Sequence, residues 1–256
     1  MPENIYDDPA FFEGYSRLPR SQQGLAGAPE WAALQAMLPC VKGLKVLDLG
    51  CGFGYFCRWA AQAGAAKVVG VDSSERMLAH ARSETRDSGI TYRQADLEDL
   101  ALPPASFDLV FSSLAIHYVA DLQRLLGAVR DWLVPEGRFV FSVEHPIYSA
   151  PAQPEWQSDA SGTRMWPLRS YLAEGKRVTD WIAPGVVKYH RTVATYVNGL
   201  LESGFRLLRL KEWGPSEDQV RDHPEWADEV HRPPFLLVSA QALSVDAADS
   251  VEGGAG

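Results

Sequence analysis

The residues from position 48 to 54 combine an acid with three glycines in a pattern typical of a ligand-binding turn. The run reads DLGCGFG and directly follows the mostly apolar residues LKVL. Glycines let the backbone turn sharply and bring a ligand close to the start of the next helix. A dinucleotide fingerprint would read G-x-G-x-x-G, whereas here the third glycine comes one position early and Asp48 precedes the first. An acid at that place favours a cationic ligand over a pyrophosphate; a merely tight strand-to-helix turn is the alternative.

Two further acids end the strands predicted to follow this turn. Asp72 lies 22 residues after Gly50, at the end of KVVGVD, where a carboxylate can accept both ribose hydroxyls of a nucleoside. Asp96 ends the run QAD, where its side chain could reach an adenine amino group and Leu97 the adenine face. A helix-capping acid at Asp72 and an acidic turn at Asp96 are the simpler alternatives, but the spacing from the glycine turn favours a nucleoside site.

Three histidines are candidates for accepting a proton from a substrate, because histidine can hold or release a proton near neutral pH. His145 follows a predicted strand, with Glu144 before it as an orienting partner and Pro146 after it. His190 is expected at the start of a late helix, and His117 beside the cofactor. We expect His145 to be the base, followed by His190. The alternatives are a turn residue at His145 and a helix cap at His190.

Short apolar runs alternate with helical patterns through the first two-thirds of the chain, which predicts an α/β fold with a parallel sheet covered on both faces. The expected strands are 44–50, 67–72, 90–96, 107–113 and 138–145, and the expected helices are 56–64, 73–89 and 121–133. A later helix is expected at 192–205. It precedes two strands, 206–213 and 234–243, that have no helical pattern between them and should pair antiparallel at the sheet edge.

The segment between the fifth strand and the late helix is too long for a plain connection and is rich in proline, tryptophan and tyrosine. Such insertions are commonly lids or binding loops, and its tryptophans either hold it onto the sheet or form an aromatic wall for a substrate. The run Asp218–Glu229 is expected to be solvated loop. The predicted organisation is an N-terminal helical cap (1–40), a cofactor-binding core (41–145), a lid or substrate insertion (146–191), a C-terminal helix and β-hairpin (192–245) and a flexible tail (246–256).

The composition excludes several classes of protein. Of 256 residues, 46% are hydrophobic and 22% charged, which is typical of a globular domain and not of a disordered chain. The net charge is −9 and the 24 basic residues are scattered, which argues against nucleic acid as a partner. No apolar stretch approaches the roughly 18 residues that span a bilayer, and the acidic, aromatic start is unlike a signal peptide. Three sparse cysteines (Cys40, Cys51, Cys57) are typical of reduced thiols, so we expect a cytoplasmic protein.

Together, the turn VLDLGCGFG and the acids at the ends of the next two strands resemble the class I S-adenosylmethionine-dependent methyltransferases, specifically their small-molecule (type 11) branch, over about residues 44–145. The resemblance implies a Rossmann-like, seven-stranded, mostly parallel sheet with an antiparallel last strand and a lid insertion after strand 5. It implies S-adenosyl-L-methionine as cofactor and S-adenosyl-L-homocysteine as product. The residues that it implies bind the cofactor are Tyr15, Arg20, Asp48, Gly50, Cys51, Gly52, Asp72, Ser73, Met77, Asp96, Leu97, Ser113, Leu114 and His117.

The predicted activity is transfer of the sulfonium methyl group to an oxygen or nitrogen atom of a small-molecule acceptor, by a monomer or homodimer. Methylases of nucleic-acid and glutamine amino groups carry an Asn/Asp-Pro-Pro-aromatic motif after the fourth strand. Here those positions read SSLAIHY, which disfavours such substrates, and no acidic cluster resembles the metal site of catechol-type enzymes. The alternatives are a cyclase or lyase that uses the same cofactor, and a noncatalytic, cofactor-binding regulatory module.

Overall fold

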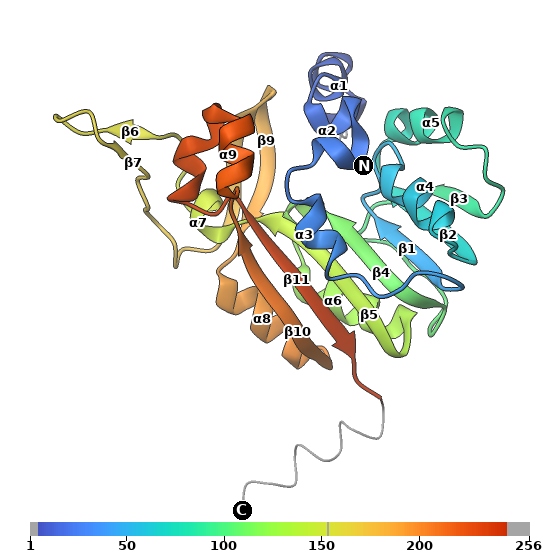
Figure 1. The fold of residues 1–256 in the computed structure, drawn as a ribbon. Coiled ribbons are helices and arrows are strands. Elements are labelled where there is room, and N and C mark those ends of the chain that lie inside the picture. Colours follow the sequence, from blue (N-terminus) through green and yellow to red (C-terminus); the bar gives the residue numbers. More distant parts are fainter. Residues whose placement is uncertain (1–4, 153, 245–256) are drawn as a thin grey trace, which may run out of the picture.

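A single seven-stranded sheet organises the chain, in the order β10-β11-β5-β4-β1-β2-β3 (Figure 1). The computed structural model describes residues 5–152 and 154–244, so the predicted flexible tail lies outside the described residues. The strands are β1 (Lys45–Leu49), β2 (Lys67–Asp72), β3 (Ile90–Gln94), β4 (Phe107–Ser113), β5 (Leu133–Glu144), β10 (Phe205–Trp213) and β11 (Phe235–Ala242). β11 pairs antiparallel with both β10 and β5, and the other strand pairs of this sheet are parallel. This confirms the mostly parallel, Rossmann-like sheet with an antiparallel last strand.

Helices cover both faces of the sheet, as predicted. On one face, α6 (Leu122–Trp132) and α8 (Val193–Glu202) pack their apolar residues against β4, β5 and β11. On the other face, α3 (Trp31–Gln35), α4 (Tyr55–Gln62) and α5 (Glu75–Ser83) form the second core cluster. The leucines of α6 recur at three- and four-residue spacing and are buried, and each buried leucine contributes about 1.5–3 kcal/mol to stability. The core therefore fixes the strand ends in space.

Side-chain caps set where two of these helices begin. The Ser74 hydroxyl accepts the Met77 N–H at 3.1 Å, so α5 starts at Glu75. The Thr192 hydroxyl accepts the Thr195 N–H at 3.2 Å, so α8 starts at Val193. Such a cap satisfies an N–H group that has no partner inside the helix. Both helices also end earlier than the predicted ranges 73–89 and 192–205, α5 at Ser83 and α8 at Glu202.

Two groups of elements outside the sheet stand above the carboxyl ends of the parallel strands (Figure 1). The N-terminal group contains η1 (Ile5–Asp7), α1 (Pro9–Ser16), α2 (Pro19–Gln22) and η2 (Gly24–Gly27). The insertion after β5 contains α7 (Pro146–Ser149) and the hairpins β6 (Gln157–Ser158) with β7 (Arg164–Met165) and β8 (Gly175–Trp181) with β9 (Ala183–His190). The two groups meet where the Trp181 ring lies 5.8 Å from the Phe11 ring, between centroids.

The connection between β10 and β11 corrects one expectation. It contains the helix α9 (Glu217–Asp222) and the 3-10 helix η4 (Pro224–Val230), so the prediction of no helical pattern and of solvated loop at Asp218–Glu229 was wrong. The sequence does contain a helix-start motif here, the capping box formed by Ser216 and Gln219. In it, the Ser216 hydroxyl accepts the Gln219 N–H and the Gln219 side chain accepts the Ser216 N–H. This reciprocal pair starts a helix even where the sequence is strongly polar.

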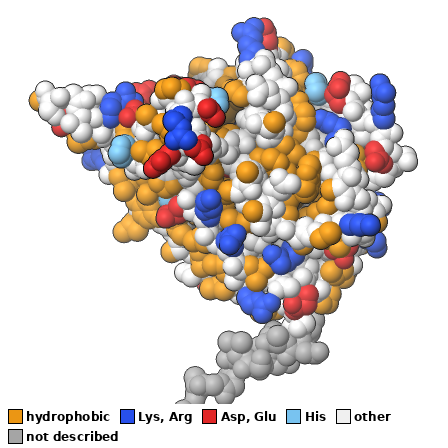
Figure 2. All heavy atoms as spheres, viewed as in Figure 1, with side chains coloured by type: hydrophobic (Ala, Val, Ile, Leu, Met, Phe, Trp, Pro, Cys, Tyr) orange, Lys and Arg blue, Asp and Glu red, His pale blue; other side chains and the backbone are white. Residues whose placement is uncertain are grey.

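Charged side chains of both signs are interspersed over the face seen in Figure 1, and among its described residues no extended basic region gathers (Figure 2). Within residues 5–152 and 154–244, no helix has the length and apolar character needed to cross a membrane.

Candidate active site

A cavity of about 1810 Å³ opens above the carboxyl ends of β1, β2, β4 and β5, between the N-terminal group and the insertion. This is the point where the strand order reverses, which is the usual ligand site of open α/β sheets. The predicted site residues that line the cavity are Tyr15, Arg20, Gly50, Gly52, Asp72, Ser73, Met77, Asp96, Leu97, Ser113, Leu114, His117 and Glu144. Those that do not line it are Asp48, Cys51, His145 and His190.

The glycine turn presents bare backbone to the cavity. Gly50 has φ +74°, and a Cβ atom there would lie 2.3 Å from the Ala115 Cβ. Gly52 has φ +50°, and a Cβ atom there would meet no protein atom within 4 Å. The space above Gly52 is therefore open for a ligand to approach the backbone closely. Gly54, with φ +73°, is the N-cap of α4.

Asp72 connects this turn to the end of β2. Its Oδ2 accepts the Gly52 N–H at 2.8 Å and its Oδ1 accepts the Ser74 N–H at 2.9 Å. Burial raises the pKa of Asp72, and the two N–H donors oppose that rise. An ionised carboxylate offers about four lone-pair positions, so about two remain for ribose hydroxyls. Together with the open backbone at Gly52, this arrangement fits the nucleoside portion of S-adenosylmethionine.

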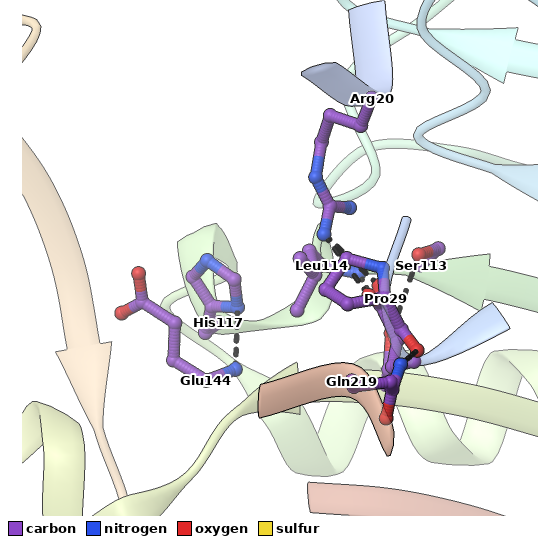
Figure 3. Close-up of polar contacts among 9 residues, drawn as sticks. Arg20, Pro29, Ser113, Leu114, His117, Glu144 and Gln219 are labelled. Atoms are coloured by element: carbon purple, nitrogen blue, oxygen red, sulfur yellow. Dashed lines mark hydrogen bonds and ion pairs between the residues drawn. The ribbon is translucent and has the colours of Figure 1, made fainter. Parts of the chain in front are cut away.

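The far wall of this part of the cavity comes from the ends of β3 and β4. Asp96 accepts the Glu98 N–H at 3.0 Å, and Leu97 lines the cavity beside it. Leu114 has φ +53°, a conformation that costs roughly 1–2 kcal/mol for a residue with a Cβ atom. Its N–H donates to the Ser142 carbonyl at 3.0 Å and contacts the Ser142 hydroxyl at 3.2 Å. These contacts hold the strained backbone and direct Leu114 toward the cavity (Figure 3).

The N-terminal group places Arg20 and Tyr15 over the cavity. Arg20 extends from α2 toward Leu114 (Figure 3), and its Nη2 lies 3.0 Å and 3.2 Å from the two carboxylate oxygens of the buried Glu30. Burial raises the pKa of Tyr15. The ion pair to Glu30 fixes the guanidinium at the cavity edge, where its other nitrogen atoms can approach an anionic group.

Asp48 lies beneath the glycine turn rather than in the cavity, which differs from the expected placement against the cofactor. Its Oδ2 lies 3.2 Å from the Cys57 Sγ, which donates to it. Burial raises the pKa of Asp48 to about 7 and the pKa of Cys51 to about 11. Asp48, Cys51 and Cys57 thus form a buried polar layer under the turn.

The two histidines predicted to accept a proton do not line the cavity. His145 caps α7: its Nδ1 accepts the Ile147 N–H at 3.1 Å, and its Nε2 lies 3.0 Å from Glu212 Oε1. His190 ends β9 instead of starting a helix, with Nδ1 2.9 Å from the Ser149 hydroxyl and Nε2 2.9 Å from the Tyr171 carbonyl. Both rings have both nitrogens engaged, and their predicted part in the reaction stays a prediction.

Glu144 does line the cavity, but with a different partner from the one expected. Its Oε1 lies 2.5 Å from the Lys188 Nζ, whereas His145 pairs with Glu212. Successive side chains along a strand point to opposite faces, so neighbours in sequence at the end of β5 diverge. The Lys188 ammonium also lies 4.9 Å from the centre of the Trp181 ring and 5.9 Å from that of Tyr118.

Several residues at this end of the cavity were not predicted from the sequence. Tyr6 and Tyr118 share a hydrogen bond of 3.1 Å between their hydroxyls. Arg232 pairs with Glu229, and its guanidinium lies 4.7 Å from the centre of the Tyr148 ring. These five residues also line the cavity. They come from four separate segments and share no local pattern, so no motif could have identified them.

The fold and the site together define a Rossmann-like, class I cofactor-binding enzyme, and comparisons with known proteins agree. Residues 47–141 match the sequence profile of the family described as "Methyltransferase domain". The structure is similar to a crystal structure of an S-adenosylmethionine-dependent methyltransferase from Mesorhizobium loti, at 58% identity and a TM-score of 0.83, covering 85% of this chain and 100% of that one. An uncharacterized protein of Haemophilus influenzae is 36% identical over 248 residues, 94% of this chain and 97% of that protein. The chain belongs to the S-adenosylmethionine-dependent methyltransferases.

A third relative matches only part of the chain. The ubiquinone biosynthesis O-methyltransferase of Cereibacter sphaeroides is 40% identical over 111 residues, which is 43% of this chain and 44% of that enzyme. The chain thus matches less than half of the length of this curated relative. The shared part is too small a share of either chain to say much about the acceptor.

Proposed function

We propose that this methyltransferase acts on an oxygen or nitrogen atom of a small-molecule acceptor that binds beneath the insertion. The observation that carries the proposal is one continuous cavity whose lining runs from Gly52 and Asp72 to Glu144, Tyr148 and Trp181. When bound, S-adenosylmethionine supplies an activated methyl group and leaves as S-adenosylhomocysteine. The protein's contribution is then positioning, exclusion of water and, where needed, removal of a proton.

At the cofactor end, we assign a part of the ligand to each group of residues. Asp72 binds the ribose hydroxyls, the Gly52 backbone faces the methionine portion, and Arg20 binds its carboxylate. Asp96 and Leu97 hold the adenine by its amino group and its face. The remaining lining residues complete the walls of this end, and they are Tyr15, Ser73, Met77, Ser113 and Leu114.

At the acceptor end, aromatic rings and balanced charges favour a small, largely uncharged molecule. Tyr118, Tyr148 and Trp181 supply apolar surface, which is typical of small-molecule sites. Of the buried cations here, Lys188 and Arg232 are each paired with a carboxylate. Arg191 donates to the backbone carbonyls of Val119 and Ala120. No run of unpaired cations therefore tracks a phosphate backbone among the described residues of this end, which supports a small molecule over a nucleic acid.

The test uses S-adenosylmethionine labelled with carbon-13 in its methyl group, together with a deproteinised metabolite extract. New carbon-13 methyl signals, with release of S-adenosylhomocysteine, are expected with wild-type protein, and at a lower rate with the Asp72→Asn variant when S-adenosylmethionine is kept well below saturation. Calorimetry with S-adenosylhomocysteine reports cofactor binding separately. Binding without any methylated product would favour the regulatory or cyclase alternatives, and no binding at all would contradict the proposal.

A further inference from the structure

The side chains of His117 and Glu144 lie next to each other at the acceptor end and point into the same open space (Figure 3). His117 belongs to the 3-10 helix η3 (Ile116–Tyr118) after β4, and Glu144 is the last residue of β5. Both residues line the cavity. The segment after β4 and the end of the neighbouring strand β5 therefore each place one polar side chain where an acceptor meets the cofactor in this fold.

The hydrogen bond between the two residues fixes the tautomer of His117. The Glu144 backbone N–H donates to His117 Nδ1 at 3.4 Å. A backbone N–H can only donate, so Nδ1 must carry its lone pair toward it and the ring proton of neutral histidine must lie on Nε2. Burial lowers the pKa of His117 to about 4, because the charge of Glu144 only partly offsets desolvation and the cations Lys188 and Arg191 add to the fall. Near pH 7 the ring is neutral, and Nε2–H faces the cavity as a donor.

The Glu144 carboxylate is complementary to that donor. Lys188 contacts only Oε1, at 2.5 Å, and Oε2 has no hydrogen-bond partner within the described part of the chain. The Lys188 ammonium is itself buried and held over the Trp181 ring. The site thus offers one fixed N–H donor and one free carboxylate oxygen to a single acceptor group.

Resting on the proposed function, we propose that the methyl acceptor is a hydroxyl group, whose proton Glu144 accepts and whose oxygen His117 Nε2–H holds. A hydroxyl oxygen has two lone pairs, so one can accept the His117 N–H while the other attacks the methyl carbon. A neutral amine nitrogen has one lone pair, which the attack uses, and a fixed N–H donor would compete for it. The donor at His117 therefore selects oxygen over nitrogen.

The step balances in atoms and charge. The hydroxyl O–H bond breaks and its proton moves to Glu144. One oxygen lone pair forms the new O–C bond, and the electrons of the broken C–S bond stay on the sulfur of the departing S-adenosylhomocysteine. The carboxylate and the sulfonium lose their opposite charges together. Lys188 acts as a positioning residue that holds Oε1 and leaves Oε2 for the proton.

The first test needs no acceptor. Nitrogen-15 NMR of histidine-labelled protein, with His117→Asn to assign the signal, should show His117 neutral and protonated on Nε2 from pH 5 to pH 8. A proton on Nδ1, or titration near pH 6.5, would overturn the inference. This measurement is independent of turnover, so it stands even if the proposed function fails.

The second test identifies the acceptor atom that receives the methyl group. In the labelled extract experiment, new methyl signals should have the carbon-13 shift of O-methyl groups, and methyl groups on nitrogen or carbon would overturn the inference. Absence of any new methyl signal would instead count against the proposed function.

Matched variants then separate the two roles. Glu144→Gln should slow methylation by about 10²–10⁴-fold, which is the rate acceleration that a positioned base usually contributes. Glu144→Asp should recover part of the rate. His117→Phe should slow it by about 10–100-fold because the developing negative charge on oxygen loses a donor, whereas His117→Asn keeps a donor and should lose less. S-adenosylhomocysteine affinity should stay within a few-fold in the Glu144 variants, which shows that they fold. Unchanged rates in both Glu144→Gln and His117→Phe would refute the assignment.

Discussion

The Asp72 carboxylate gives the sharpest test of the cofactor site, because two backbone donors hold it in place before any ligand binds. The Gly52 N–H and the Ser74 N–H occupy one position on each oxygen, at 2.8 Å and 2.9 Å. The positions that remain face the cavity and are available to two ribose hydroxyls. Asp72→Asn keeps the size of the side chain but replaces one charged oxygen with an NH₂ group that cannot accept.

The expected loss follows from the hydrogen bonds that change. Hydrogen bonds to charged groups contribute about 1.5–3 kcal/mol, against about 0.5–1.5 kcal/mol for neutral pairs. Removing the charge from two ribose contacts, and one acceptor outright, should therefore cost about 1.5–3 kcal/mol of binding free energy. At 1.4 kcal/mol per tenfold, S-adenosylhomocysteine should bind about 10- to 150-fold more weakly.

Isothermal calorimetry with S-adenosylhomocysteine measures this directly, and urea unfolding shows whether the variant is folded. Asp87→Asn is the matched control: Asp87 is also an aspartate that accepts a backbone N–H, from Gly89 at 2.8 Å, but it is exposed and does not line the cavity. Equal affinity of wild type and Asp72→Asn, with both folded, would refute the assignment of Asp72 to the ribose.

Three further predictions concern the glycine turn, the buried layer beneath it and the start of the insertion. Gly50→Ala should lower the free energy of unfolding by about 2 kcal/mol or more, because its Cβ atom would lie 2.3 Å from the Cβ atom of Ala115. Gly52→Ala should lower the free energy of unfolding by less. It should weaken S-adenosylhomocysteine binding in calorimetry, since its Cβ atom would enter the cavity. Burial raises the pKa of Asp48 from 3.8 to about 7. The native state therefore binds the Asp48 proton more tightly than the unfolded state does. The stabilisation that this gives at low pH is lost as the pH rises through about 7. Urea unfolding at pH 5 and pH 8 should show wild type losing roughly 2–3 kcal/mol more than Asp48→Asn, and parallel curves would contradict the raised pKa. His145→Ala should lower the free energy of unfolding by about 1–3 kcal/mol, because the variant loses the contact with Glu212 and the cap of α7. Cofactor affinity should not change. A variant as stable as the wild type would argue against this structural role.

The cofactor end of the site was accessible from the sequence because it depends on local geometry. The glycine turn and Asp72 lie at the ends of adjacent parallel strands, so apolar patterning alone brings them together. The same reasoning could not orient Asp48, because it does not say which side chains of a buried strand face the turn. Asp48 points to the Cys57 thiol on α4 instead, a contact set by how the helix packs.

The acceptor end depends on contacts between residues far apart in the sequence. His145 contacts Glu212, which is 67 positions away in the sequence, and Glu144 contacts Lys188, which is 44 positions away. Neither pairing follows from periodicity or spacing. The expectation that Glu144 would orient His145 assumed that sequence neighbours stay neighbours, which the alternation of side chains at a strand end does not allow.

The tip of the β8–β9 hairpin explains how these distant parts close one cavity. Ile182 at the tip has φ +62°, an unfavourable conformation for a β-branched residue. Its side chain packs so closely on α1 that a Cβ atom at Gly14 would lie 2.5 Å from the Ile182 Cγ2, while the Trp181 ring packs against Phe11 and Tyr15. β8 and β9 pair only with each other and not with the main sheet. β9 also contacts η3 and α7, and at the tip the contacts with the N-terminal group offset the strain at Ile182. The part of the acceptor wall at Trp181 is thus positioned by side-chain contacts between two segments outside the sheet, whereas Gly50, Gly52 and Asp72 at the cofactor end are positioned by the sheet itself.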